Sequence, residues 1–300
     1  MRAAVIDLGT NTFHLIIADL SDGTVRMLYK TTVPVLLGQG RINENMIIPE
    51  AFERGIKTLS AFKATIDQHQ ADVIKATATS AVRSAINGQA FVDEARDVGI
   101  EIEVITGDQE AAYIFDAVRA TGVIKDTVLV MDIGGGSTEF IIGDAKGLLW
   151  KKSYNIGAAR LMQAYFHSDP MSDADRSAII TVLDETLGEL KSACTHYKPK
   201  ALVGSAGAFE SYAAMLNNGE EAKDIPTMPL DIASYRALSA HLIASTHAQR
   251  VDMKGLISLR VDMIVIAAIL TSYVLDTTGV QALHLSTYDL KMGILHSLLK

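Results

Sequence analysis

A gap-free internal repeat is the feature that most constrains the fold of this sequence. The segment VIDLGTNTFHLII at 5–17 matches VMDIGGGSTEFII at 130–142. Each copy has the pattern of an apolar strand, an Asp-x-Gly turn, a Thr or Ser hydroxyl and a second apolar strand ending in Ile-Ile. The duplication predicts two similar domains that face each other across a cleft, where ligands commonly bind.

Each copy is expected to begin an antiparallel meander of three strands within an α/β fold. The predicted strands are 2–7, 12–20 and 25–33 in the first copy and 127–132, 139–143 and 147–154 in the second. Alternating helices and strands are predicted after the first meander, beginning with a helix from Pro49 to about Gln68. Mostly helical sequence is predicted after the second meander.

The linker Thr121-Gly122 is the expected domain boundary. It divides the chain into a first domain at 1–122 and a second at 123–300. The last helix, at about 287–300, is expected to be able to pack back on the first domain.

Composition excludes several classes of protein. The 300 residues are 49% hydrophobic and 21% charged, which suits two globular cores. A net charge of −8 without a Lys/Arg-rich block argues against general binding to nucleic acid or to anionic membranes. The longest apolar run, 263–275, is shorter than the roughly 20 residues of a membrane span and predicts a buried helix. A single cysteine, Cys194, and a first segment that resembles a strand rather than a signal peptide favour the cytoplasm.

The second copy of the repeat has the composition of an anion-binding loop. Its loop residues are Gly134, Gly135, Gly136 and Ser137. Glycines let backbone amides approach an anion, and the preceding Asp132 could bind a hard cation that Glu139 shares. A glycine-rich hairpin without a ligand is the alternative. Neither a dinucleotide fingerprint nor a P-loop fits, because a strand follows this loop and no Gly-x-x-x-x-Gly-Lys-Ser/Thr occurs.

Three further segments are candidates for phosphate binding or catalysis. Gly204 and Ser205 lie in a strand-to-helix loop, which is either an anion site or a plain turn. Arg83 is expected on a short helix capped by Ser80, where it is either a phosphate ligand or a solvated surface residue. Glu110 lies in the first turn of a helix, where acids are favoured by the helix dipole without any catalytic role.

With these motifs in place, the sequence resembles the exopolyphosphatase and guanosine pentaphosphate phosphohydrolase family of the actin-like superfamily. The resemblance rests on DLGTNTFHL at 7–15, TSAVR at 79–83, Gly107 with Glu110, 132–139 and 204–207. It implies a duplicated actin-like, ribonuclease H-like ATPase fold with two domains around a central cleft. It also implies hydrolysis of a terminal phosphoanhydride by water, with Glu110 as the catalytic base.

The resemblance also implies roles for the other candidate residues. Asp132 and Glu139, with Asp7 as a further candidate, would lie near a divalent metal, expected to be Mg²⁺. The phosphate-binding residues would be Thr10, Asn11, Thr12, Arg83, Gly134, Gly135, Gly136, Ser137, Gly204 and Ser205. Inorganic polyphosphate or a phosphorylated nucleotide is the expected partner, and a homodimer is common in the family.

Two departures from the family pattern keep other functions open. Gln109 replaces a second Glu of many members, and Met292 replaces a Glu in the segment STYDLKMG at 286–293. The main prediction is an exopolyphosphatase. The alternatives are a guanosine pentaphosphate or other nucleotide phosphohydrolase, a non-catalytic polyphosphate or nucleotide sensor, and a small-molecule kinase of the same superfamily.

Overall fold

The computed structural model describes residues 1–21, 23–205, 207–222 and 225–299. Its strands are β1 (Arg2–Leu8), β2 (Thr12–Ser21), β3 (Thr24–Pro34), β4 (Val73–Ala78), β5 (Ile102–Val104), β6 (Val128–Ile133), β7 (Thr138–Asp144), β8 (Gly147–Tyr154), β9 (Ala201–Ser205), β10 (Thr227–Leu230) and β11 (Ala282–Ser286). The helices are α1 (Pro49–Gln68), α2 (Ser80–Ser84), α3 (Gly88–Asp97), α4 (Gly107–Ala120), α5 (Ala158–Tyr165), α6 (Asp173–Thr186), α7 (Gly188–Tyr197), α8 (Gly207–Leu216), α9 (Ile232–Ala244), α10 (His247–Val251), α11 (Ile264–Thr278) and α12 (Leu290–Ser297), with 3-10 turns η1 (Ile42–Glu44) and η2 (Ser258–Arg260).

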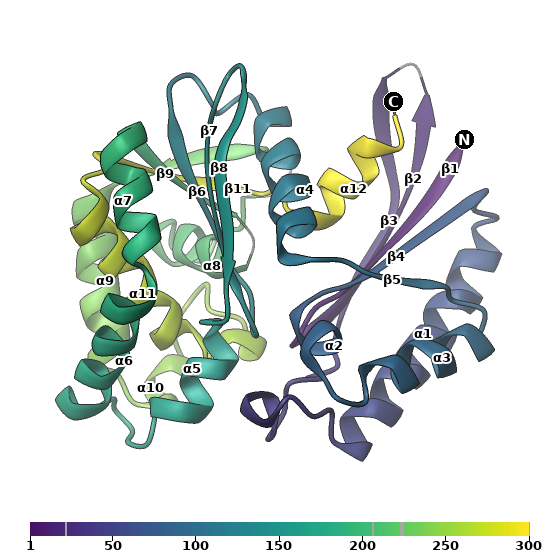
Figure 1. Ribbon diagram of the computed structural model, residues 1–300, viewed down its shortest axis with the longest axis horizontal. Helices are drawn as coiled ribbons and strands as arrows, with labels where there is room; N and C mark the ends of the chain where they lie inside the picture. Colours follow the sequence, from purple (N-terminus) through teal and green to yellow (C-terminus); the bar gives the residue numbers. More distant parts are fainter. Residues whose placement is uncertain (22, 206, 223–224, 300) are drawn as a thin grey trace.

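The predicted duplication is visible in the order of the strands. One sheet has the order β3-β2-β1-β4-β5, and the other has β10-β11-β9-β6-β7-β8. Without the edge strand β10, the second sheet is the first repeated, with β8, β7, β6, β9 and β11 in the places of β3, β2, β1, β4 and β5. The antiparallel and parallel pairings also correspond. Figure 1 shows the two sheets in separate halves of the molecule, side by side.

The central strands β1 and β6 are largely apolar because both of their faces are buried. In β1, Ile6 faces the helices α1 and α3, while Val5 faces the middle of the molecule. In β6, Met131 packs into the core that α11 shares, while Val130 faces the middle. Each sheet therefore has its own outer core, and a third core lies between the sheets.

Two helices fill the middle core, each following the last parallel strand of its half. α4 follows β5 and packs against β7 and β8 of the other sheet, and α12 follows β11 and packs against α4 and β1. Figure 1 shows both helices between the sheets. A Cβ on Gly293 of α12 would lie 2.0 Å from the backbone carbonyl oxygen of Tyr113, so glycine permits this close helix crossing.

Most predicted elements are present, including the helix at Pro49–Gln68 and the buried helix α11. The region after the second meander is mostly helical, as predicted, but it also contains β10 and β11, which the sequence did not reveal. One prediction is wrong. Ser80 does not cap α2, because Thr79 occupies the N-cap position, without a side-chain cap bond, and Ser80 is the first helical residue. The predicted loop residue 206 lies outside the described residues.

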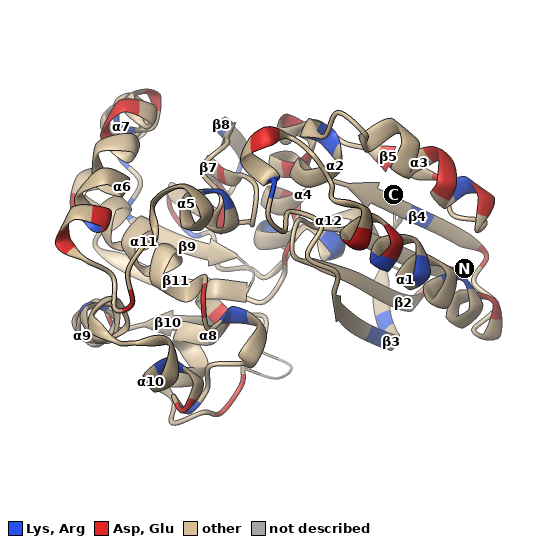
Figure 2. Cartoon of the chain, turned by 90° about the horizontal axis from the view of Figure 1, so that it is seen from below, with Lys and Arg blue, Asp and Glu red and all other residues tan. Residues whose placement is uncertain are grey.

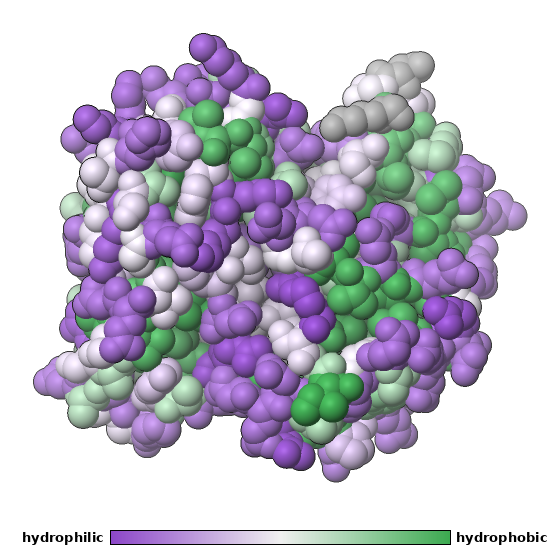
Figure 3. Space-filling view, viewed as in Figure 1, coloured by the Kyte–Doolittle hydropathy of each residue, from purple (hydrophilic) through white to green (hydrophobic). Residues whose placement is uncertain are grey.

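The surface is polar with scattered apolar groups. Figure 3 shows hydrophilic side chains over much of one face and a notch between the halves at the top. Figure 2 shows acidic and basic residues on helices of both halves. Among the described residues, no helix combines the length and apolar character that crossing a membrane requires.

Candidate active site

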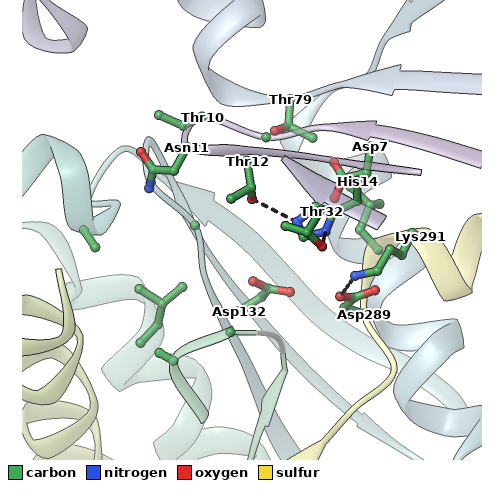
Figure 4. A pocket seen from close by; sticks show the side chains of 18 of the residues that line it. Asp7, Thr10, Asn11, Thr12, His14, Thr32, Thr79, Asp132, Asp289 and Lys291 are labelled. Carbon is green, nitrogen blue, oxygen red and sulfur yellow. Dashed lines mark hydrogen bonds and ion pairs between the residues drawn. The ribbon is translucent and has the colours of Figure 1, made fainter. Parts of the chain in front are cut away.

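A cavity of about 350 Å³ lies between the two halves and is lined by residues from both. Several of the residues predicted from the sequence line it together: Asp7, Thr10, Asn11, Thr12, Glu110, Asp132, Gly134, Gly135, Gly136 and Ser137. Figure 4 shows how the labelled members project from strands and loops of both sheets into one space. Segments more than a hundred residues apart therefore share one site.

The two glycine loops of the repeat have the same backbone geometry. The amide of Gly9 donates to the carbonyl oxygen of Thr12 at 3.0 Å, and the amide of Gly134 donates to that of Ser137 at 3.0 Å. A Cβ on Gly9 would lie 2.9 Å from the carbonyl oxygen of Thr12, and a Cβ on Gly134 would lie 2.9 Å from the carbonyl oxygen of Ser137. Glycine is therefore required at both positions, and the sequence repeat corresponds to a structural one.

The loops also touch each other across the cavity. A Cβ on Gly135 would lie 2.5 Å from Nδ2 of Asn11, and a Cβ on Gly136 would lie 2.5 Å from Oγ of Ser80. Ser80 is buried, and its hydroxyl has no hydrogen-bond partner within the described chain. The second and third glycines thus let the backbone of one half approach side chains of the other.

Buried carboxylates surround the loops. Asp7 and Asp132 occupy equivalent positions near the ends of β1 and β6, and Glu139 pairs with Asp132 in the register of β6 and β7. Burial raises the pKa of Asp7 to about 7 and raises the pKa of Asp132 well above its ordinary value. Burial also raises the pKa of Glu139, against hydrogen bonds from Ser153 and Ser137. A bound cation beside these carboxyl groups would favour their charged forms and lower their pKa values.

Glu110 reaches the cavity from the first turn of α4 and is 7% exposed. Nη1 of Arg83 donates to Oε2 of Glu110 at 3.0 Å and to the carbonyl oxygen of Ile105 at 3.0 Å. Burial and then the nearby Glu139 raise the pKa of Glu110, and Arg83 opposes them. Glu110 is therefore a buried carboxylate that Arg83 orients and whose proton affinity is increased.

The departure at Gln109 has a structural explanation. Its Oε1 accepts a hydrogen bond from the backbone amide of Thr106 at 2.9 Å, while Oγ1 of Thr106 accepts from the amide of Gln109 at 3.2 Å. This reciprocal pair is a capping box, in which Gln serves as well as Glu. Gln109 thus fixes the start of the helix that carries Glu110.

The donor set fits a divalent metal bound together with substrate. Among the described residues, no group of three His, Cys, Asp or Glu side chains is arranged to hold a metal ion by itself. Mg²⁺ commonly uses only one or two protein carboxylates and takes its other ligands from water and substrate phosphates. Asp132 is suited to such a role, since Oγ of Ser205 donates to its Oδ2 at 3.0 Å and orients it.

Four predicted site residues do not line the cavity. Arg83 lies behind Glu110, and Glu139 accepts a hydrogen bond from Oγ of Ser153 at 2.6 Å. Ser205 contacts Asp132, and Gly204 lies beneath Phe209, whose ring a Cβ would meet at 2.0 Å. Arg83 and Ser205 therefore hold the lining residues Glu110 and Asp132. Direct contact of any of the four with phosphate or metal stays a prediction.

Several polar residues line the cavity without a site role having been predicted for them: His14, Lys30, Thr31, Thr32, Thr79, Ser80, Glu210, Arg260, Thr287, Asp289 and Lys291. Two of them, Asp289 and Lys291, lie in the segment 286–293 that the sequence analysis had compared with the family pattern. In the structure β11 and α12 repeat β5 and α4, so this segment takes the place in the second half that Glu110 and its neighbours take in the first. Glu210 and Arg260 come together only in the fold, 3.0 Å apart.

The fold and the shared cavity define a duplicated α/β protein with one site between its two sheets. The chain belongs to the Ppx/GppA phosphatase family, which it matches over residues 16–300. The predictions of this family, of a duplicated α/β fold and of a phosphoanhydride hydrolase are thereby confirmed.

Individual relatives agree with this assignment. A putative exopolyphosphatase of Haemophilus influenzae is 29% identical, with 99% of this chain and 91% of the relative covered. Exopolyphosphatase 2 of Mycobacterium tuberculosis is 30% identical, with 99% and 98% covered. A crystal structure of an exopolyphosphatase from Cytophaga hutchinsonii is 38% identical and has a TM-score of 0.96, with 100% of this chain and 98% of that chain covered.

Proposed function

We propose that this protein is an exopolyphosphatase that hydrolyses the terminal phosphoanhydride of inorganic polyphosphate and releases orthophosphate. The observation that carries the proposal is the position of Glu110, a buried carboxylate held by Arg83 in a cavity between two glycine loops. The full-length similarity to proteins named exopolyphosphatase supports polyphosphate as the substrate.

In the proposed mechanism, Glu110 orients a water molecule and accepts its proton as the oxygen attacks the terminal phosphorus. The bond from that phosphorus to the bridging oxygen breaks, and the shortened polyphosphate leaves with the bridging oxygen. Loop residues Thr10–Thr12 and Gly134–Ser137 bind phosphate oxygens, while Arg83 holds Glu110 in place. Bound Mg²⁺, held by Asp132 with Glu139 or Asp7 nearby, would supply positive charge for the phosphate oxygens.

A nucleotide substrate is the second candidate. A guanosine-5'-triphosphate,3'-diphosphate pyrophosphatase of Photobacterium profundum is 32% identical over 209 residues, and this chain covers 42% of its length. Because relatives named exopolyphosphatase are matched over nearly their full length, polyphosphate is the preferred proposal. A homodimer and a cytoplasmic location remain predictions.

The direct test is phosphate release from long-chain polyphosphate with Mg²⁺, compared with guanosine pentaphosphate and ATP at equal concentrations of terminal phosphate. We expect the fastest release from polyphosphate and its loss on addition of a chelator. Faster release from guanosine pentaphosphate would replace polyphosphate with the nucleotide. No release from any of them would favour a sensor, and transfer from ATP to an added acceptor would favour a kinase.

A further inference from the structure

The start of α12 brings a buried ion pair into the cavity that the mechanism above does not use. Nζ of Lys291 contacts Oδ2 of Asp289, both residues line the cavity, and their side chains are 17% and 11% exposed. Figure 4 shows Lys291 on the side of the cavity that carries Asp7 and His14, with Asp289 facing toward Asp132. The pair therefore lies next to the carboxylates at the centre of the site.

The charges of the cavity give this pair its importance. Among the described lining residues, the carboxylates are Asp7, Glu110, Asp132, Glu210 and Asp289, and the cations are Lys30, Arg260 and Lys291. Such an excess of acids repels a polyphosphate unless cations contact it directly. Lys30 is exposed, and Arg260 is held by Glu210 and Ser211 at 3.0 Å each. Lys291 is the most enclosed of the three cations.

The local environment keeps Lys291 charged. Burial alone lowers the pKa of Lys291, but the contact with Asp289 and the charge of Asp7 outweigh it, so the pKa is raised. The pair is also incomplete, because Oδ1 of Asp289 is buried and has no hydrogen-bond partner in the described chain. A permanently charged ammonium is thus held inside the cavity by a single carboxylate oxygen.

The duplicated topology gives this position a counterpart. In the first half, α4 follows β5 and carries Glu110 in its first turn, with the cation Arg83 as its partner. In the second half, α12 follows β11 and carries Lys291 in its first turn, with the carboxylate Asp289 as its partner. The two helices pack against each other, so the opposite charges enter one cavity from adjacent helix starts.

We propose that Lys291 is a further phosphate-binding residue of this site, whose ammonium contacts phosphate oxygens of the substrate, and that Asp289 is the residue that positions it. A lysine ammonium suits phosphate as a compact point charge. The inference rests on the proposed function, because it requires that a phosphate chain enters this cavity. It adds a cation from the second half to the set of phosphate ligands.

The test measures the affinity for tripolyphosphate by isothermal titration calorimetry in the presence of Mg²⁺. The parent protein carries Glu110→Gln, so that tripolyphosphate stays bound without being hydrolysed. Lys291→Met removes the charge and keeps the length of the stem, and Lys291→Gln removes the charge while keeping a donor for Asp289. We expect both to bind roughly tenfold to hundredfold more weakly, the range for one charge-assisted hydrogen bond. Lys291→Arg should recover most of the affinity.

Lys75→Met is the matched control, since Lys75 also pairs with a carboxylate, Glu103, but does not line the cavity. It should bind tripolyphosphate as the parent does. In the wild-type background, Lys291→Gln should lower phosphate release while Lys75→Met leaves it unchanged. Asp289→Asn should raise KM for polyphosphate by a smaller factor than Lys291→Gln.

The outcomes separate this inference from the proposed function. Unchanged tripolyphosphate affinity in folded Lys291→Gln would overturn the role of Lys291, even if its melting temperature fell. Tripolyphosphate binding that depends on Lys291, without phosphate release by the wild type, would overturn only the proposed hydrolysis. A parent that does not bind tripolyphosphate would overturn both. If Lys291→Met does not fold, the affinity of Lys291→Gln for tripolyphosphate decides the question by itself.

Discussion

The two halves of this protein share a topology but place different chemical groups at equivalent positions. In the register of the first half Asp7 lies opposite His14, whereas in the second half Asp132 lies opposite Glu139. Burial and Lys291 lower the pKa of His14 to about 3, so it is neutral at physiological pH and bonds to threonine hydroxyls. The acidic pair that suits a metal is thus confined to the second half.

At the starts of α4 and α12 the acidic group belongs to the first half and the basic group to the second. The first half contributes the carboxylate Glu110 from α4, and the second contributes the ammonium of Lys291 from α12. Hydrolysis needs a base on one side of the phosphorus and positive charge around the phosphate oxygens. Duplication thus supplies a scaffold with two similar loops, while unlike residues at equivalent positions make the site asymmetric.

The largest effect on hydrolysis is expected from removing Glu110, the catalytic base that the first half contributes. Glu110→Gln removes the proton acceptor and keeps an oxygen for Arg83, so phosphate release from polyphosphate should fall roughly 10²- to 10⁴-fold. Stabilisation against heat by tripolyphosphate should persist, because binding is assigned to the loops. Hydrolysis close to the wild-type rate would remove Glu110 from the mechanism and the asymmetry with it.

A smaller effect is expected from the acidic pair of the second half. Ser205→Ala removes the hydrogen bond that orients Asp132, and the Mg²⁺ concentration for half-maximal hydrolysis should rise roughly 10- to 100-fold. The rate at saturating Mg²⁺ should recover. Ser192→Ala, which changes an exposed hydroxyl on α7, is the control. An unchanged Mg²⁺ requirement would separate Asp132 from the metal.

A still smaller effect on hydrolysis is expected from disturbing the close contact between the second glycine loop and the first half. Gly136→Ala places a Cβ against Ser80 and Thr10 of the first half, so the halves must separate slightly or Ser80 must move. Overpacking of this kind costs about 1–3 kcal/mol, and hydrolysis should fall about tenfold as the loops lose their spacing. Gly188→Ala has open space around the new Cβ and should change neither stability nor rate. Equal behaviour of the two variants would show that close loop contact is unimportant.

The smallest effect on hydrolysis is expected at the crossing of the two central helices. Gly293→Ala would drive a Cβ into the carbonyl of Tyr113, and the free energy of unfolding in urea should fall by about 1–3 kcal/mol. Loss of stability should exceed loss of rate, because neither Gly293 nor Tyr113 lines the cavity. A stability equal to that of Gly188→Ala would show that the crossing tolerates a larger residue.

The sequence predicts the fold well wherever the signal is local. The repeat, the apolar strands around Val5 and Val130 and the helix start at Pro49 can all be recognised in short windows of sequence. β10 and β11 were missed because they are short, at four and five residues, and lie within largely helical sequence. Pro229 further weakens the strand pattern of β10.

The site is predictable to the extent that motifs carry it. Glu110, Asp132 and the two loops were found because each forms part of a recognisable segment. The bond from Ser205 to Asp132 spans 73 residues, and the partnership of Arg260 with Glu210 spans 50, so only the fold reveals them. Lys291 and Asp289 fall in a segment that was noted for its departures, but their charge acquires meaning only once α12 lies beside α4.

The most direct test of the account is a crystal structure of Glu110→Gln with Mg²⁺ and tripolyphosphate. We expect phosphate density in the cavity, in contact with Thr10–Thr12 of one half and Gly134–Ser137 of the other, with the terminal phosphorus facing residue 110. Tripolyphosphate bound to one half alone, or outside the cavity, would contradict the claim that two unlike halves form a single hydrolytic site.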